Sequence, residues 1–149
     1  MDRKKAREPA IYNRRAKHDY QILETFSAGI SLEGPEVKSI RTGNASLAES
    51  FGKVDKNEVF LYNMYITPYR YSRDVGDPRR RRKLLLHNKE IQHLSAAVSQ
   101  KGLTLVPLRL YFRRGWAKVE LAIAKGKREF DKRESIKRRE AERAMRSQR

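Results

Sequence analysis

The sequence predicts a small, mainly β domain: an antiparallel barrel with two or three short helices, followed by a basic, helix-prone C-terminal tail. Three observations lead to this prediction. Six or seven short segments are rich in β-branched, aromatic and aliphatic residues and are bounded by Gly, Pro or Asn, which is typical of strands and turns. Only two segments before the tail repeat apolar residues at helical spacing. Beyond residue 124 the apolar pattern gives way to a dense series of charges.

The N-terminal third contains a polar lead segment, a strand and a helix. The β-favouring side chains of residues 18–26 predict a strand, which residues 28–32 continue after a bend. Pro35 stands where a first helical residue is expected, Glu36 lies in the first turn, and Gly43 follows the expected end. A short helix is therefore predicted before Gly43.

The middle of the chain predicts a hairpin and a long loop. Segments 47–54 and 58–66 flank a three-residue polar turn at 55–57. Both faces of the second segment are apolar, so we expect it to be a central strand of a closed or covered sheet. The loop at 68–78 is long for a small domain, and loops of this kind are usually functional or mobile. The basic run at 79–83 leads from it into an apolar segment.

The last third predicts a second helix and the remaining strands. Apolar positions at helical spacing indicate a helix within residues 88–102. Two strands at 103–106 and 108–112, interrupted by Pro107, should precede another at 116–125. Many short strands with few helices favour a small antiparallel barrel of the oligonucleotide-binding type over a helix bundle or a βαβ sheet.

Positive charge is concentrated at both ends of the chain. The 149 residues include 35 Lys and Arg against 18 Asp and Glu, a net charge of +17 at pH 7. Residues 1–17 contain seven basic and two acidic side chains, and residues 125–149 contain eleven and five. Such an excess indicates a polyanionic partner or an anionic surface. We therefore divide the chain into a basic flexible arm (1–12), a barrel domain (13–130) and a basic tail (131–149).

Composition also indicates the cellular compartment and excludes disulfides, thiolate metal sites and a membrane-spanning segment. The absence of cysteine excludes disulfides and thiolate metal sites and fits a reducing cytoplasm. No apolar run approaches the ~20 residues needed to span a bilayer, and the N-terminal segment is charged where a signal peptide would be apolar. We expect a soluble, cytoplasmic, monomeric protein with no metal, no cofactor and no membrane partner.

The tail is predicted to become helical only in contact with a partner. Glu134 and Arg138, like Glu142 and Arg146, are four residues apart in the orientation that supports a helix, and each pair contributes only about 0.2–0.5 kcal/mol. No apolar stripe is present to pack such a helix on the barrel. We expect the tail to be disordered when free and helical when bound to phosphates.

Signals for catalysis are weak, whereas signals for nucleic-acid binding recur. His18 and Asp19 could begin a nuclease pair, yet the sequence holds no second cluster and no glycine-rich phosphate loop to support it. The run 79–83 could be a solvated or localising run, but it lies beside a Tyr- and Arg-rich loop, a mixture suited to RNA. The segment 125–128 combines cations with Gly126, which permits close backbone approach to phosphates.

Four aromatic residues are candidates for stacking on bases, although packing in the core or at its rim is the commoner role of such side chains. They are Tyr12, Tyr69, Tyr71 and Trp116.

Six short motifs, in one order along nearly the whole chain from residue 13, carry a resemblance to a known family. They are NRRAKHDY at 13–20, EVKSIR at 36–41, RKLLLH at 82–87, GLTLVPL at 102–108, AKGK at 124–127 and DKR at 131–133. Together they resemble the SsrA-binding protein (small protein B) family of bacterial trans-translation.

The resemblance implies an oligonucleotide-binding-type barrel without enzymatic activity that binds the tRNA-like domain of transfer-messenger RNA. It also implies delivery of this RNA to the vacant decoding site of a stalled ribosome for rescue and peptide tagging. The tail would then become helical in the empty messenger channel of the small subunit and so probe for the absence of a message.

Matched position by position, the resemblance implies two sets of contact residues. The RNA-binding set is Asn13, Arg14, Arg15, Lys17, Glu36, Arg41, Leu85, Lys118, Lys125 and Lys127, to which the composition of segment 125–128 adds Arg128. The set for the decoding centre and the tail contacts is Phe130, Asp131, Lys132, Arg133, Ile136, Lys137, Arg138 and Arg139. Two positions depart from the family pattern, since Ser27 stands where many relatives carry Glu, and Phe130 where His or Tyr is frequent.

The residues by themselves leave two other classes open. One is a ribosomal protein or general RNA chaperone with the same type of barrel. The other is a ribonuclease that uses His18 and Asp19.

Overall fold

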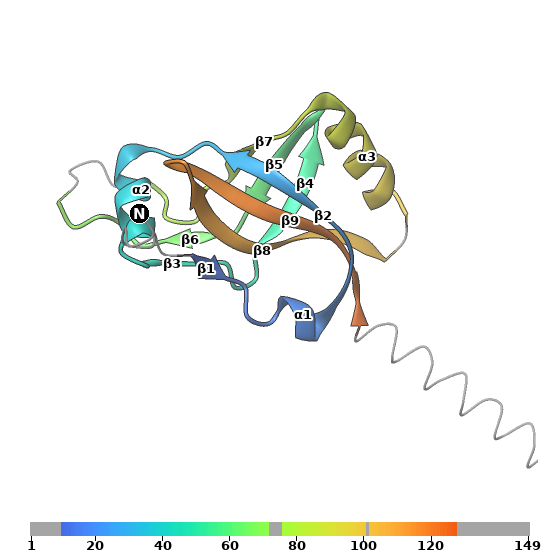
Figure 1. The fold of residues 1–149 in the computed structure, drawn as a ribbon, viewed down its shortest axis with the longest axis horizontal. Coiled ribbons are helices and arrows are strands. Elements are labelled where there is room, and N and C mark those ends of the chain that lie inside the picture. Colours follow the sequence, from blue (N-terminus) through green and yellow to red (C-terminus); the bar gives the residue numbers. More distant parts are fainter. Residues whose placement is uncertain (1–9, 72–75, 101, 128–149) are drawn as a thin grey trace, which may run out of the picture.

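A computed structural model describes residues 10–71, 76–100 and 102–127. The elements are, in chain order, β1 (Ile11–Tyr12), α1 (Ala16–Asp19), β2 (Tyr20–Ile30), α2 (Gly34–Arg41), β3 (Ala45–Ser46), β4 (Phe51–Asp55), β5 (Glu58–Tyr62), β6 (Tyr65–Ile66), β7 (Arg82–Leu85), α3 (Asn88–Val98), β8 (Leu103–Arg113) and β9 (Trp116–Gly126) (Figure 1). The predicted 1–9 part of the N-terminal arm, Arg128, and the whole set from Phe130 to Arg139 lie outside the described residues.

The antiparallel strands pair into a closed ring. The main sheet has the order β1-β8-β4-β5-β7-β2-β9, and the additional pairing of β8 with β9 joins its two sides. Figure 1 shows α2 and α3 at opposite ends of this ring, with the short β3–β6 pair beside α2. Fully buried Leu61, Leu105 and Leu121 lie in the core that the ring encloses. The predicted small, mainly β antiparallel barrel is confirmed.

The long strands differ from the predicted segments. β2 is one strand of 11 residues, with a register shift between Ile22 and Glu24 in place of the bend expected after residue 26. β8 runs through Pro107, because the shift between Pro107 and Arg109 places the proline, which lacks an N–H, at an irregularity of the ladder. Bulges allow both strands to curve around the ring without ending.

Local sequence explains the helix starts and the tight hairpin turn. Glu36 accepts a hydrogen bond from the backbone N–H of Glu33 and so completes a capping box at α2. Lys56 and Asn57 have positive φ, which gives the two-residue turn that joins β4 to β5 in place of the expected three-residue turn. Helix α1 is not among the predicted elements, since its last two residues fall in the strand expected at 18–26 and no element is predicted for Ala16 and Lys17. None of the helices within the described ranges is both long and apolar enough to cross a membrane.

Gly52 lies where β4 meets β8, opposite Leu105. A Cβ atom at position 52 would lie 2.9 Å from the Cβ of Leu105. Leu105 is a fully buried residue. We expect Gly52→Ala to lower the free energy of unfolding by about 1–3 kcal/mol, because the overpacked core must shift. Urea denaturation measures this loss. Gly34→Ala is the control, since a Cβ there meets nothing within 4 Å; equal stability of both variants would contradict the prediction.

Candidate nucleic-acid interface

The basic run at 79–83 is divided by the alternation of β7. Arg82 turns inward and is 1% exposed, whereas Arg81 and Lys83 point outward. Lys83 Nζ lies 2.7 Å from Glu58 Oε2. Arg81 lies 3.6 Å from Asp55 and stacks over the Phe60 ring at 3.9 Å. Much of this run is therefore neutralised within the protein, and it is less available to RNA than its composition suggests.

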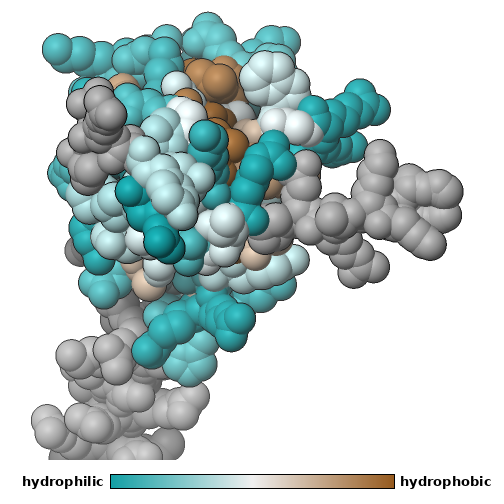
Figure 2. Space-filling view, turned by 90° about the vertical axis from the view of Figure 1, so that its left-hand side faces the viewer, coloured by the Kyte–Doolittle hydropathy of each residue, from teal (hydrophilic) through white to brown (hydrophobic). Residues whose placement is uncertain are grey.

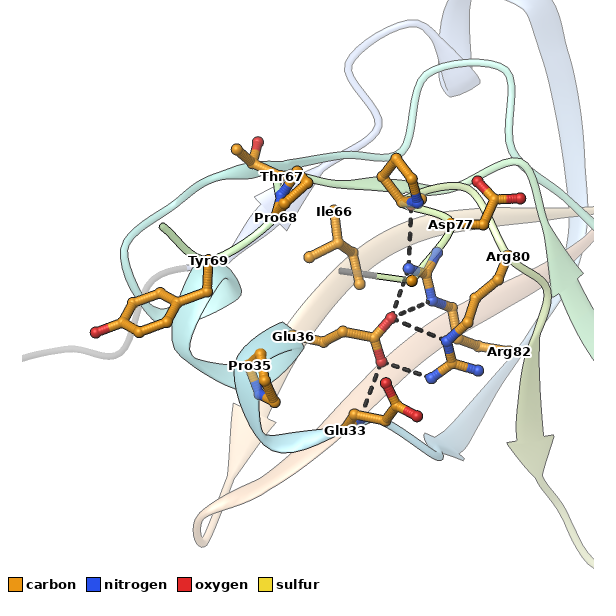
Figure 3. A pocket seen from close by; sticks show the side chains of 12 residues that line it. Glu33, Pro35, Glu36, Ile66, Thr67, Pro68, Tyr69, Asp77, Arg80 and Arg82 are labelled. Atoms are coloured by element: carbon orange, nitrogen blue, oxygen red, sulfur yellow. Dashed lines mark hydrogen bonds and ion pairs between the residues drawn. The ribbon is translucent and has the colours of Figure 1, made fainter. Parts of the chain in front are cut away.

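A buried ion cluster joins α2 to the end of the long loop. Glu36 Oε2 accepts hydrogen bonds from Arg82 Nη2 at 2.6 Å and Nε at 3.0 Å, and Arg80 Nη2 donates to Glu36 Oε1 at 2.6 Å (Figure 3). Arg82 also donates to the backbone oxygens of Met64 at 2.6 Å and Pro78 at 3.1 Å. Glu36, placed by the resemblance in the RNA-binding set, is thus engaged inside the protein, and its side chain is only 12% exposed.

The cluster is ionic. Burial alone would raise the pKa of Glu36, but hydrogen bonds from the Glu33 N–H, Arg80 and Arg82, with the charge of Arg82, lower that pKa below its ordinary value of 4.5. Burial lowers the pKa of Arg82 below its ordinary value, and the hydrogen bonds and charge of Glu36 offset this effect only in part. A guanidinium nevertheless stays protonated in proteins. The pair therefore carries both charges at neutral pH.

The first candidate site is a groove that we call the Leu85 groove, with a volume of about 760 Å³. Gly29 of β2 is paired with Leu85 of β7 on one side and with Lys118 of β9 on the other. Directly paired residues share a face of the sheet, so Leu85, Gly29 and Lys118 lie side by side. Leu85 packs closely over Gly29, where a Cβ atom would lie 3.3 Å from the Leu85 Cβ. Leu85 is 53% exposed. The groove can therefore receive a planar apolar group and an anion together.

Aromatic residues form the rim of the Leu85 groove. Trp116, at the β8–β9 turn, is 74% exposed and lines it. Phe112 lines it as well and carries the Arg41 guanidinium 4.5 Å from its ring centre, which brings Arg41 to the rim. Ser27 also lines it and shares a 2.9 Å hydrogen bond with the Tyr111 hydroxyl. Figure 2 shows the face at the α2 end of the barrel, where a narrow hydrophobic strip is surrounded by hydrophilic side chains.

A second group of sequence-predicted residues lies at the start of β2. Asn13 Nδ2 donates to the Pro107 oxygen at 2.9 Å, and this contact fixes the segment that leads into α1. Arg14, Arg15 and Lys17 follow it and are exposed. Lys127 Nζ donates to the Lys17 oxygen at 2.8 Å, so the end of β9 is joined to the same region.

The structure thus brings the predicted residues into two groups. Leu85, Lys118 and Arg41 belong to the Leu85 groove, and Asn13, Arg14, Arg15, Lys17 and Lys127 surround α1. Lys125 is paired with Gln21 near the second group. Glu36 belongs to neither group. Sequence reasoning missed Gly29, although a glycine inside a strand signals a bulge or a close approach.

The structure offers little for metal binding or acid–base chemistry. No group of three or more His, Asp or Glu that could hold a metal occurs in the described part of the chain. His18 Nδ1 lies 2.9 Å from Asp19 Oδ1, but the imidazole is 80% exposed, and Asp19 also faces Arg15 at 3.7 Å. The two side chains form an exposed hydrogen bond at the end of α1.

A closed antiparallel barrel with an apolar, aromatic-rimmed groove, in a chain of net charge +17, defines a class of small β-barrel proteins suited to nucleic acid. Comparison with known proteins makes the assignment specific. The family model described as SmpB protein matches residues 10–149, and the chain belongs to this family.

Its relatives are similar over most of their length. The SsrA-binding protein of Chlorobium chlorochromatii is 57% identical over 138 residues, which cover 91% of this chain and 88% of the relative. That of Geobacillus thermodenitrificans is 55% identical over 134 residues, or 89% and 86% of the two chains. A solved structure described as "tmRNA-SmpB: a journey to the center of the bacterial ribosome" is 55% identical, with a TM-score of 0.69 over 80% of this chain and 85% of that one.

Proposed function

We propose that this protein binds the tRNA-like domain of transfer-messenger RNA and delivers this RNA to stalled ribosomes in the cytoplasm for trans-translation. It acts by binding and positioning, without catalysis of its own. The observation that carries the proposal is the Leu85 groove, in which Leu85, Gly29 and Lys118 lie on three neighbouring strands of a chain that belongs to the SmpB family.

The groove supplies two complementary kinds of contact. Lys118 is suited to a backbone phosphate, and Leu85 and Trp116 offer apolar and aromatic surface to an unstacked base. Gly29 lets the Leu85 side chain pack closely over β2, since a Cβ atom at position 29 would lie 3.3 Å from the Leu85 Cβ. Ser27 offers a hydroxyl where relatives often carry a carboxylate, so the groove here lacks one negative charge.

The two groups of predicted residues divide the binding surface. The cations Arg14, Arg15 and Lys17, with Lys125, Lys127 and Arg128, extend the RNA surface at the start of β2. The tail from Asp131, preceded by Phe130, reaches the decoding centre and messenger channel of the small subunit. Glu36 contributes by fixing α2, and thereby Arg41, beside the Leu85 groove.

Purified full-length protein tests the assignment directly. It should retard the tRNA-like domain in a mobility-shift assay at moderate salt, and excess unrelated RNA duplex should compete poorly. The logarithm of the binding constant should fall with the logarithm of the salt concentration by roughly 0.7–0.9 per phosphate neutralised. Equal affinity for the unrelated duplex would overturn the specific assignment.

Lys118→Glu should weaken binding of the tRNA-like domain by about 1–3 kcal/mol, because it removes a charge-assisted contact and places a carboxylate beside phosphate. Filter binding at several salt concentrations measures the loss. Lys53→Glu is the matched control, since Lys53 is exposed on β4 and changes the net charge equally. If both variants lose the same affinity, overall charge rather than the Leu85 groove explains binding.

A further inference from the structure

The outer face of the barrel continues from the Leu85 groove onto β9 and β8. Ser27, which lines the groove, is paired with Glu120 of β9. Lys118, which also lines it, is paired with Tyr111 of β8. Directly paired residues share a face of the sheet, and Val119 between the two β9 residues is fully buried, so Glu120 points outward. Glu120 lies about 7 Å along β9 from Lys118, so one nucleotide can contact both.

Glu120 is held in place by the protein and can still accept hydrogen bonds from a ligand. Arg109 Nε donates to Glu120 Oε1 at 3.0 Å, and the same guanidinium lies over the Tyr111 ring, 4.2 Å from its centre. The Glu120 side chain is 32% exposed. Its second oxygen, Oε2, has no hydrogen-bond partner among the residues that the structure describes. Since an ionised carboxylate offers about four acceptor positions, most of its capacity remains available.

A pair of hydroxyl groups lies beside this carboxylate. Ser27 Oγ and the Tyr111 hydroxyl share a hydrogen bond of 2.9 Å. Each hydroxyl carries one hydrogen and their mutual bond uses only one of the two, so the pair has one O–H left to donate. Ser27 is exposed and lies directly opposite Glu120. The structure therefore places a spare donor next to a group that can only accept.

This combination complements the Watson–Crick edge of guanine. That edge presents one acceptor, O6, followed by two adjacent donors, N1–H and the N2 amino group, and a carboxylate can accept from both donors. Adenine, cytosine and uracil each present only one donor group on the same edge. Proteins reach such edges in the unstacked bases of single-stranded RNA. A bare phosphate, in contrast, would be repelled by Glu120.

We propose that Glu120 and the Ser27–Tyr111 hydroxyl pair form a base-reading site that selects an unpaired guanine in the bound RNA. The carboxylate accepts from N1–H and the amino group, and the spare hydroxyl donates to O6. Lys118 holds the adjoining phosphate, and Arg109 is a positioning residue that fixes the carboxylate. The inference rests on the proposed function in taking RNA as the ligand. It adds a preference for one base, which cations and exposed apolar surface do not provide.

Three single-stranded RNA hexamers test this preference on the full-length protein. Each is a fluorescein-labelled uridine hexamer that carries one internal guanosine, inosine or adenosine, and fluorescence anisotropy at fixed salt measures its affinity. Inosine keeps O6 and N1–H and lacks only the amino group. The guanosine hexamer should bind about tenfold more tightly than either of the others, because the carboxylate loses a charge-assisted hydrogen bond with them. Equal affinity for the three hexamers would overturn the inference.

Variants of the carboxylate are compared by the ratio of guanosine to inosine affinity, which is insensitive to a uniform change in charge. Glu120→Gln should lower this ratio from about ten to near one. Glu58→Gln is the matched control, since it removes the same charge from a half-exposed carboxylate paired with Lys83 at 2.7 Å, and it should keep the ratio. Urea midpoints verify that both variants fold. A ratio unchanged in Glu120→Gln, or lost equally in both variants, would contradict the proposal.

Arg109 is tested by rescue. Arg109→Met should lower the same ratio in part, because Glu120 is no longer fixed, and Arg109→Lys should restore most of it by keeping a cation beside the carboxylate. A purely structural role would alter the urea midpoint and leave the ratio unchanged, which would remove Arg109 from the site.

Two further measurements separate this inference from its neighbours. In the 15N-labelled protein, the guanosine hexamer should shift the Glu120 amide signal saturably, and octaarginine should not; a shift with this peptide alone would show a surface for a basic protein segment and overturn the inference. If the tRNA-like domain is bound specifically while the three hexamers bind equally, the inference fails and the proposed function stands. If guanosine is preferred while the tRNA-like domain is bound no better than an unrelated duplex, the proposed function fails instead.

Discussion

Arg82→Met should lower the free energy of unfolding by about 3–5 kcal/mol, because it leaves the Glu36 carboxylate in a buried site without its main partner. The guanidinium has no exposed surface and also satisfies the backbone oxygens of Met64 and Pro78. Arg80 remains beside Glu36, which places the expected loss near the lower end of this range. Equilibrium urea denaturation at pH 7 measures it.

Lys83→Met is the control from the same basic run. Lys83 and its partner Glu58 are about half exposed, and such a surface pair contributes about 0–1 kcal/mol. The double variant Glu36→Gln/Arg82→Met should recover part of the lost stability, because no buried carboxylate remains without its main partner and the charge left on Arg80 is partly exposed to water. Equal losses for Arg82→Met and Lys83→Met would show that the buried cluster contributes no more than a surface pair.

The same cluster predicts how stability depends on pH. The folded-state pKa of Glu36 lies below its ordinary value of 4.5, so its contribution is fully present above pH 4.5 and is lost as the pH falls through the folded pKa. The stability difference between the wild type and the Glu36→Gln variant should therefore be constant near neutrality and narrow below pH 4.5. A difference that persists unchanged into acid would contradict this account.

Deletion of residues from Asp131 onward should abolish peptide tagging on stalled ribosomes and leave affinity for the tRNA-like domain nearly intact. The physical reason is the division proposed above, in which the barrel grips this RNA and the tail contacts the ribosome. A reconstituted translation assay with a message lacking a stop codon measures tagging, and filter binding measures affinity.

A variant with residues 134–149 in scrambled order is the control for the deletion, since it keeps the charge and composition of the tail. It should bind the RNA normally and fail in tagging if sequence-specific tail contacts matter. Full tagging by the scrambled variant would show that the charge and composition of the tail matter and that its residue order does not. A large loss of RNA affinity on deletion would refute the division between barrel and tail.

Much of the fold could be predicted because strand periodicity and turn residues are local signals. Alternation over 116–125 predicted β9 closely, and Pro35 and Gly43 marked the region of α2. The continuity of β8 could not be predicted, because Pro107 normally ends a strand and only the partner β9 shows that it lies at a register shift. Helix α1 has four residues, too few for a periodic signal.

The candidate site could be predicted less completely than the fold. Exposed cations are visible in composition, but the pairing of Arg80 and Arg82 with Glu36 spans more than 40 residues and follows only from the folded ring. The same holds for Gly29, whose importance comes from its neighbours on β7 and β9.

The end of β9 has a consequence for how tightly the tail must bind. Gly126 is paired with Tyr20, and Lys127 donates a hydrogen bond to the Lys17 oxygen, so the described part of the chain ends at a point fixed beside α1. Under the proposed function, a barrel held on a ribosome-bound RNA would keep residues 131–149 tethered close to this fixed point. For short flexible tethers such confinement corresponds to an effective concentration on the order of millimolar. If residues 131–149 contact the messenger channel as proposed, weak contacts, each negligible for a free peptide, would therefore suffice and would still permit rapid release.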